Sequence, residues 1–378
     1  MKTIHWLFIL ILLGGCKDKY NAPVHIPATG YLVEEGFINV GNGPTNIKLS
    51  RATGLDSPYV LPEYNAQVSV ESENGSSYPL TEQGNGNYSI NQVPVDFSQK
   101  YRLKINSASG KEYQSDLSVA KITPEIDSLS WKAVSDGVWI YVSTHDPQNK
   151  TVYYEWQYDE TWQYESAYIS AFEYIHDSIV LRPQSDQIYR CWTSHSSTTI
   201  SIASSVKLNT DVIFETPLTL VPFSSTDKLS SKYSILIKQF ALTKEWYEWL
   251  QTVRKNTEQL GSIFDAQPSE IRGNIHCVTD PGELVIGFVG CTTETQKRIF
   301  ISKSEIPQAQ VFSAYRNCQL DTIPNDPIVL AQYYGNNNNI PVIYYTVMGF
   351  IRGVIGSDAG CVDCRARGGV TTKPDFWQ

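Results

Sequence analysis

Apolar and polar residues alternate with a period of two in many short stretches of the chain. Residues 101–105 alternate without exception, and residues 67–71 place Val68 and Val70 on one face. This period is typical of strands that bury one face. Turn signals such as Asn74-Gly75 separate the stretches and favour hairpins between neighbouring strands. The chain is therefore predicted to be mainly β.

The spacing of these strands and turns divides the chain into regions. Short strands over residues 29–121 predict an Ig-like or transthyretin-like sandwich of about one hundred residues. Residues 122–305 predict a second β-sandwich-like domain, with strong strands at residues 138–142 and 298–301. Residues 306–378 form a Cys-containing segment, which we expect to pack on the second domain.

One segment, residues 243–260, breaks the period of two and shows helical spacing. Its apolar stripe consists of Leu242, Trp246, Trp249, Leu250, Val253 and Leu260. Thr243 is placed to cap the helix, and Gly261 to end it. The stripe could dock a partner or cover a sheet. We favour the sheet, because exposed tryptophans would form a costly apolar patch.

The second domain also contains a run of aromatic residues, which precedes this helix in the sequence. It comprises Tyr153, Tyr154, Trp156, Tyr158, Trp162, Tyr164, Tyr168, Phe172 and Tyr174. Such a run could be a stacking platform for a sugar or another flat ligand. The alternative is a half-buried sheet, since Tyr and Trp suit a pleated surface with one wet edge. We favour the sheet.

The amino terminus carries a targeting signal. Lys2 precedes an apolar stretch over residues 4–13, which is too short to cross a bilayer comfortably. Residues 13–16, Leu-Gly-Gly-Cys, resemble the lipobox of bacterial lipoproteins. The resemblance implies a signal peptide over residues 1–15, lipidation of Cys16 and a polar tether over residues 16–28. The mature chain is expected to be anchored to a membrane through lipid.

Net charge and amino-acid composition narrow the class of protein. The 378 residues carry a net charge of −9, and the pI is about 5.2. Nucleic acid is not an expected partner, because a binder would need a basic face. Aromatic residues make up 12% and charged residues 18%, which favours a folded β-rich chain over disorder.

Six cysteines remain after Cys16, and an even number in an exported chain predicts disulfides. The candidates are Cys191, Cys277, Cys291, Cys318, Cys361 and Cys364. They allow fifteen pairings. We expect Cys361 and Cys364 to pair with Cys191 and Cys318, which leaves Cys277 with Cys291. Redox catalysis and zinc binding at Cys361-x-x-Cys364 are the less favoured alternatives, because no helix is predicted after it and further ligands are not close in sequence.

Catalytic signatures are absent from the sequence. It contains neither a G-x-S-x-G elbow nor an H-E-x-x-H motif. The histidines are scattered, although a triad assembled from distant positions would not show in the sequence. We therefore expect no enzyme activity, no cofactor and no metal. Ser128, Ser178 and Thr322 stand in tripeptides that resemble the acceptor pattern of Bacteroidota O-glycosylation.

Several stretches together resemble the Bacteroidota outer-membrane lipoproteins known as domain of unknown function 4249. Besides the lipobox, they are residues 33–38, 233–240, 261–268 and 273–275 and the tail from Cys361 to Trp377. The resemblance implies an outer-membrane lipoprotein that accompanies a TonB-dependent β-barrel receptor carrying a carboxypeptidase-like extension. Location on the cell surface follows from that company, although Lys17-Asp18-Lys19 has a single acid and leaves a periplasmic orientation open.

From this resemblance we expect a non-catalytic accessory subunit, a lid or ligand-delivery protein, of a TonB-dependent receptor. Its ligand would be an unidentified small molecule or peptide. One alternative is a structural subunit of a larger outer-membrane complex for secretion or protein insertion. A second alternative is a surface hydrolase or glycan-binding protein, which would need the aromatic run to line a cleft with a carboxylate pair.

Overall fold

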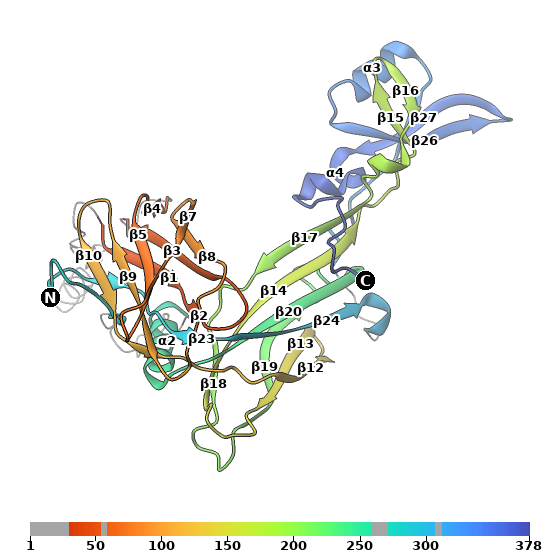
Figure 1. Cartoon of the computed structure of the whole chain (residues 1–378). Helices are drawn as coiled ribbons and strands as arrows, with labels where there is room; N and C mark the ends of the chain where they lie inside the picture. Colours follow the sequence, from red (N-terminus) through yellow and green to blue (C-terminus); the bar gives the residue numbers. More distant parts are fainter. Residues whose placement is uncertain (1–29, 54–58, 259–270, 307–311) are drawn as a thin grey trace, which may run out of the picture.

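The computed structural model describes residues 30–53, 59–258, 271–306 and 312–378. The fold is mainly β, as predicted. Three units follow one another along an elongated molecule: an amino-terminal sandwich, a central β unit and a distal unit (Figure 1). The predicted signal peptide, tether and Cys16 lie outside the described residues, as does the family-like stretch 261–268.

The amino-terminal sandwich consists of two sheets around one apolar core. The first sheet contains β22 (Val285–Ile286), β1 (Leu32–Gly36), β3 (Thr45–Arg51), β8 (Asn87–Ile90), β7 (Thr81–Gly84) and β4 (Leu61–Pro62). The second contains β21 (Ile275–Cys277), β10 (Glu112–Ser115), β9 (Lys100–Asn106), β5 (Gln67–Ser72), β6 (Ser77–Pro79) and β11 (Ser118–Val119). The alternation in β5 and β9 buries Val70, Leu103 and Ile105 between the sheets.

Residues 275–292 correct the predicted domain boundary. The sequence placed them in the second domain, yet they return to the sandwich. β22 pairs in parallel with β1, β21 pairs with β10, and β23 (Cys291–Thr292) pairs in parallel with β2 (Ile38–Asn39). The sandwich is therefore completed by strands from far along the chain, and the two units are joined by more than the linker near residue 122.

The central unit packs a three-stranded sheet on a five-stranded one. The first contains β12 (Ile126–Ala133), β13 (Gly137–His145) and β19 (Val212–Pro222). The second contains β17 (Arg190–Ser196), β14 (Tyr153–Glu165), β20 (Lys232–Ala241), β24 (Glu294–Ser302) and β18 (Ser201–Ser204), with the 3₁₀ helix η3 (Lys303–Glu305) after β24. Tyr154 and Trp156 of β14 are buried between the sheets. The interpretation of the aromatic run as sheet is confirmed.

The predicted helix is α2 (Lys244–Glu258), and the Thr243 hydroxyl accepts a hydrogen bond from the Trp246 amide at 3.2 Å. Trp246 and Leu250 are buried against Phe240 and Leu242, and the Trp246 ring stacks on Phe288. The helix therefore covers apolar surface between the central unit and the sandwich, as expected. No helix in the described ranges is long and apolar enough to cross a membrane.

The distal unit combines two parts of the chain. One is the hairpin of β15 (Phe172–Ile175) and β16 (Ser178–Leu181), with the 3₁₀ helix η2 (Gln184–Asp186). The other comprises β25 (Asp321–Pro324), α3 (Pro327–Tyr334), β26 (Asn339–Val347), β27 (Phe350–Asp358), α4 (Ala359–Val362) and the 3₁₀ helix η4 (Cys364–Arg367). The tail contacts the second domain through its last residues, as expected: the Tyr164 hydroxyl donates to the Cys364 carbonyl at 2.9 Å, and Arg367 pairs with Asp227 at 2.6 Å. Farther along, Trp377 packs on Trp192 and Phe300.

Candidate functional site

The distal unit has a small core of its own. Ile323 of β25, Leu330 and Tyr334 of α3, and Val354 of β27 are buried together. A Cβ at Gly356 would lie 2.3 Å from the Tyr334 hydroxyl oxygen, so this glycine allows the helix to approach β27 closely. The Asp326 side chain caps α3 by accepting from the Ile328 amide at 2.9 Å. These contacts give the unit a defined shape at the far end of the molecule.

Two disulfides attach this unit to the central unit and brace it internally. Cys191 of β17 is bonded to Cys364 of η4, and Cys318 is bonded to Cys361 of α4. Cys361 and Cys364 thus have the partners that we expected, and neither forms a C-x-x-C disulfide with the other. The structural interpretation of this motif is confirmed.

The expected Cys277–Cys291 bond is wrong. Both cysteines are buried free thiols in the sandwich. Cys277 lies on β21, whereas Cys291 lies on β23 in a different strand pairing. Burial raises the pKa of the Cys291 thiol to about 12, which favours the protonated, unreactive form. An even count of cysteines therefore overpredicted the number of bonds.

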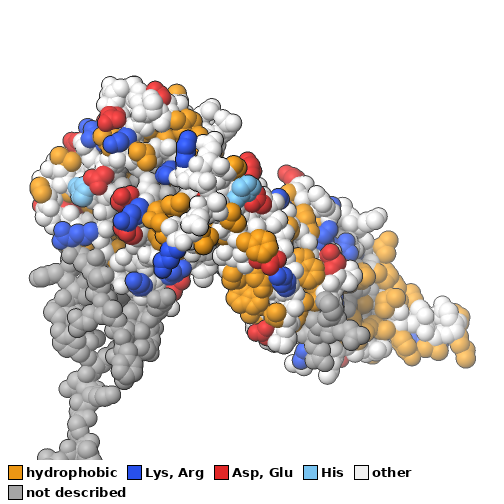
Figure 2. Space-filling view, turned by 90° about the horizontal axis from the view of Figure 1, so that it is seen from below, with side chains coloured by type: hydrophobic (Ala, Val, Ile, Leu, Met, Phe, Trp, Pro, Cys, Tyr) orange, Lys and Arg blue, Asp and Glu red, His pale blue; other side chains and the backbone are white. Residues whose placement is uncertain are grey.

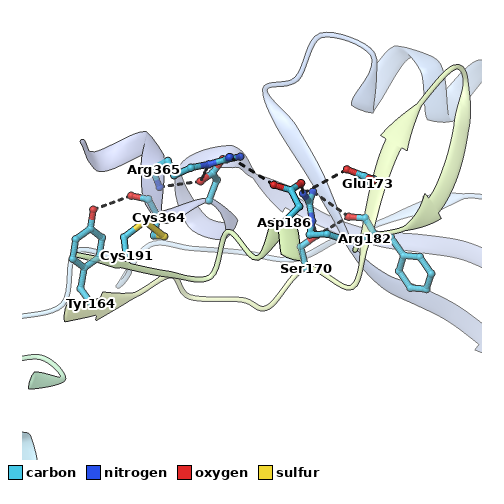
Figure 3. Close-up of polar contacts among 10 residues, drawn as sticks. Tyr164, Ser170, Glu173, Arg182, Asp186, Cys191, Cys364 and Arg365 are labelled. Carbon is cyan, nitrogen blue, oxygen red and sulfur yellow. Dashed lines mark hydrogen bonds and ion pairs between the residues drawn. A yellow bond between two sulfur atoms is a disulfide. The ribbon is translucent and has the colours of Figure 1, made fainter. Parts of the chain in front are cut away.

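Ion pairs extend along the same connection (Figure 3). The buried Arg182 guanidinium contacts Asp186 at 2.9 Å and Glu173 at 3.6 Å. Arg365 contacts Asp363 at 2.8 Å and reaches Asp186 at 3.9 Å. The hydrogen bond with Asp363 raises the pKa of Arg365. Charges from η2, η4 and β15 are thereby linked, which joins the two parts of the chain that make up the distal unit.

The most exposed apolar feature of this unit is the end of the β26–β27 hairpin. We call residues 343–352 the hairpin arm. Met348 and Gly349 both have positive φ, at 51° and 82°, as a two-residue turn between twisted strands requires. Met348 is 94% exposed and Phe350 67%. The other exposed apolar side chains of the arm are Ile343, Tyr345, Val347 and Ile351.

The arm extends beyond the strands that flank it. β25 pairs with β27 only over residues 353–356, and the Ala171 amide reaches β26 at the Val342 carbonyl. Within the described ranges, β26 and β27 pair with each other over residues 346–351, but no strand outside the hairpin pairs with these residues. The surface at this end of the molecule is dominated by hydrophobic side chains (Figure 2). Arg352 is the single charged residue between positions 340 and 357.

An unpaired, apolar and nearly uncharged strand end is unusual, because natural proteins protect such edges with charges, prolines or covering loops. Residues 340–351 are largely apolar in the sequence, but this pattern alone does not show whether they are covered or exposed. The available signal was the single charge in this stretch combined with Met348-Gly349 at its centre.

The other predicted site residues are dispersed. Ser128, Ser178 and Thr322 are exposed, on β12, β16 and β25. His145 pairs with Asp127 at 2.7 Å, and His276 with Asp116 at 3.2 Å. In the part of the chain that the structure describes, no group of three or more His, Cys, Asp or Glu residues is arranged to hold a metal ion.

Comparison with known families identifies the chain. The family model described as domain of unknown function DUF4249 matches residues 18–298. The chain belongs to the DUF4249 family. The match covers the sandwich and most of the central unit of this DUF4249 protein, and it ends before the hairpin arm. No curated protein matches it.

Solved structures similar to this DUF4249 protein are distant. The chicken interferon gamma receptor alpha chain is 12% identical, with a TM-score of 0.16, and the alignment covers 56% of this chain and 90% of the receptor chain. A candidate carbohydrate-binding protein from Bacteroides uniformis is 9% identical, with a TM-score of 0.16 and the same two coverages. At such scores neither likeness carries an argument about function.

Proposed function

We propose that this protein is a lipid-anchored, non-catalytic accessory subunit of an outer-membrane transport complex, attached through Cys16 at the cell surface. Its partner is a β-barrel of the TonB-dependent receptor class. The lipobox-like sequence supports the anchor, and family membership supports the location. The observation that carries the proposal is the hairpin arm, an apolar protrusion at the end of a unit that the Cys191–Cys364 disulfide joins to the central unit.

The arm suits a protein partner better than a lipid bilayer. Its outer backbone N–H and C=O groups need hydrogen-bond partners, and each unsatisfied group in hydrocarbon costs several kcal/mol. A groove on another protein can bury Met348 and Phe350 and also pair with the free strand edges. Both faces of the arm expose apolar side chains, so the complementary surface is expected to be concave.

A lipid anchor would assist this contact. Confinement to the same membrane raises the local concentration of the two proteins, so that a small docking surface suffices. The chain itself makes or breaks no bond in this proposal. The aromatic run motivated a hydrolase or glycan-binding function. Tyr154, Trp156 and Tyr158 of this run are buried in the core of the central unit, and other members pack in separate apolar clusters, which gives that alternative no support.

Co-purification tests the proposal. The full-length protein would be extracted from outer membranes in mild detergent and isolated by an affinity tag, with proteins that accompany it identified by mass spectrometry. We expect one β-barrel receptor in near-stoichiometric amount and an acylated Cys16 at the amino terminus. Recovery of the barrel should fall strongly in a Met348→Asp, Phe350→Ser variant.

A matched control is available on the central unit. Phe214 on β19 is 75% exposed and distant from the arm in sequence, so Phe214→Ser removes an equally accessible ring. Recovery of the barrel should not change in this control. An unmodified amino terminus, or equal recovery with both variants, would contradict the proposal. A stoichiometric barrel from a secretion or insertion machine would instead favour the structural-subunit alternative.

A further inference from the structure

A cleft with a volume of about 670 Å³ lies where the chain passes from the sandwich to the central unit. It is formed by the turn before β9, the linker from Val119 to Asp127, and the turn after β13. Its size falls within the range of small-molecule sites, which occur preferentially at junctions between domains. The proposed docking of the arm does not involve this cleft, which is built from other units.

The linker forms a rigid floor. The Lys121 amide donates to the Cys291 carbonyl at 3.0 Å, and the Thr293 amide donates to the Lys121 carbonyl at 3.1 Å. Thr123 is buried, and its amide donates to the Thr293 hydroxyl at 2.8 Å. Because Lys121 and Thr123, on either side of Ile122, make these bonds, the Ile122 side chain is held facing outward and is 63% exposed.

Two further apolar side chains surround Ile122 in the cleft. Phe97 is 48% exposed at a turn in which Asp96 accepts from the Ser98 amide at 2.9 Å. Val119 of β11 is also exposed. Three exposed apolar side chains on fixed backbone, gathered in one concave surface, form a prepared contact for an apolar group.

The opposite wall is equally fixed. The Asp146 carboxylate accepts hydrogen bonds from the amides of Gln148, Lys150 and Thr151 at 2.8–2.9 Å. Burial opposes ionisation of Asp146, but these backbone bonds outweigh it and lower its pKa. His145 is paired with Asp127, and this hydrogen bond raises the pKa of the imidazole. The carboxylates of Asp127 and Asp146 therefore already have hydrogen-bond partners within the protein.

The charges that remain accessible have both signs. Lys121 donates a weak hydrogen bond to the Lys150 carbonyl at 3.4 Å. Within the described residues, neither the Lys150 ammonium nor the Glu125 carboxylate has an ion-pair partner. The cleft thus offers ammonium groups, a carboxylate and an apolar floor. A complementary ligand has an anionic end, a cationic end and an apolar body between them.

We infer that this cleft binds a short peptide with an apolar side chain and free charged ends. A neutral sugar fits the lining less well, because sugars favour the broad faces of Trp, Tyr and Phe, and Phe97 is the one such residue in this lining. Lys121 and Lys150 face the peptide carboxylate, Glu125 faces its amine, and Ile122 with Phe97 contacts its side chain.

Isothermal titration of the full mature chain in detergent tests this inference. The probes are tripeptides with central Leu, Ile or Phe between glycines, the same tripeptides with acetylated and amidated ends, and maltotriose. We expect saturable binding of at least one free tripeptide and weaker binding of its blocked form. Ile122→Ser should weaken binding about tenfold, the effect of losing most of one buried aliphatic contact.

The controls keep the inference falsifiable. Phe214→Ser and Lys255→Ala change exposed side chains outside the cleft and should not alter binding, whereas Lys150→Ala should weaken it. Thermal unfolding of each variant would show that the fold is kept, as expected for exposed positions. Failure of every free tripeptide to bind saturably, an unchanged affinity in Ile122→Ser, or preferential binding of maltotriose would overturn the inference.

Discussion

Removal of the Cys191–Cys364 disulfide should loosen the distal unit without unfolding the sandwich. The bond closes a loop of 173 residues, and the chain-entropy relation assigns such a loop about 5 kcal/mol. The Cys318–Cys361 bond closes 43 residues, for which the same relation gives about 4 kcal/mol. Both numbers are upper values, because measured disulfides typically contribute about 2–4 kcal/mol.

The perturbation is the double substitution Cys191→Ser, Cys364→Ser, which leaves no unpaired thiol from this bond. Because the chain has several units, one global unfolding energy would be ill-defined, and hydrogen exchange of individual peptides is the suitable assay. We expect the opening free energy of peptides from β25, β26 and β27 to fall by about 2–4 kcal/mol. Peptides from β1, β5 and β9 should keep their protection.

The matched control is Cys277→Ala, which removes a buried thiol that closes no loop. Its effect should be confined to peptides of the sandwich. Unchanged protection of the distal unit in the double serine variant would refute the reasoning, as would an equal loss of protection throughout the chain.

Three further substitutions should have distinct effects. Burial raises the pKa of Glu155 from its ordinary 4.5 to about 7, so the folded state holds the proton more tightly. Stability should therefore fall by about 3 kcal/mol as pH rises through this interval, and urea unfolding should show that Glu155→Gln lacks this loss. Gly290→Ala places a Cβ 2.1 Å from the Trp246 ring, and thermal unfolding should report about 1–3 kcal/mol of destabilisation. Arg182→Ala removes the ion pair of Glu173 and leaves Asp186 with only its long contact to Arg365. Proteolysis should show that the opening free energy of the distal unit falls by about 2–3 kcal/mol, less than for a fully buried pair because Asp186 is half exposed. Unchanged values in these assays would contradict the respective arguments.

Local pattern was sufficient for much of the fold. The alternation in residues 101–105 gave a strand, and the stripe around Trp246 with its Thr243 cap gave the helix, because both signals depend only on neighbouring residues. The two-residue strands β22 and β23 were missed as parts of the sandwich. Their parallel pairing with β1 and β2 joins segments about 250 residues apart, and a local pattern carries no information about such contacts.

The candidate surfaces were harder to foresee. An apolar stretch such as residues 340–351 has the same local pattern whether it is covered or exposed, because exposure depends on how far β25 and β15 extend beside it. The cleft also arises from tertiary arrangement, since Phe97, Ile122 and Lys150 are brought together only by the junction of two units. The disulfides at Cys361 and Cys364 were foreseen because an even number of cysteines in an exported chain predicts bonds and the surroundings of this motif disfavour a redox or zinc site.

Site-specific photo-cross-linking from the hairpin arm tests the central claim most directly. A benzophenone side chain would replace Met348 in cells that carry the full-length protein, with position 214 as the control, and outer membranes would be irradiated. The account predicts a light-dependent adduct between position 348 and one β-barrel protein, and no such adduct from position 214. An adduct of position 348 with lipid alone, or with no partner, would contradict the account.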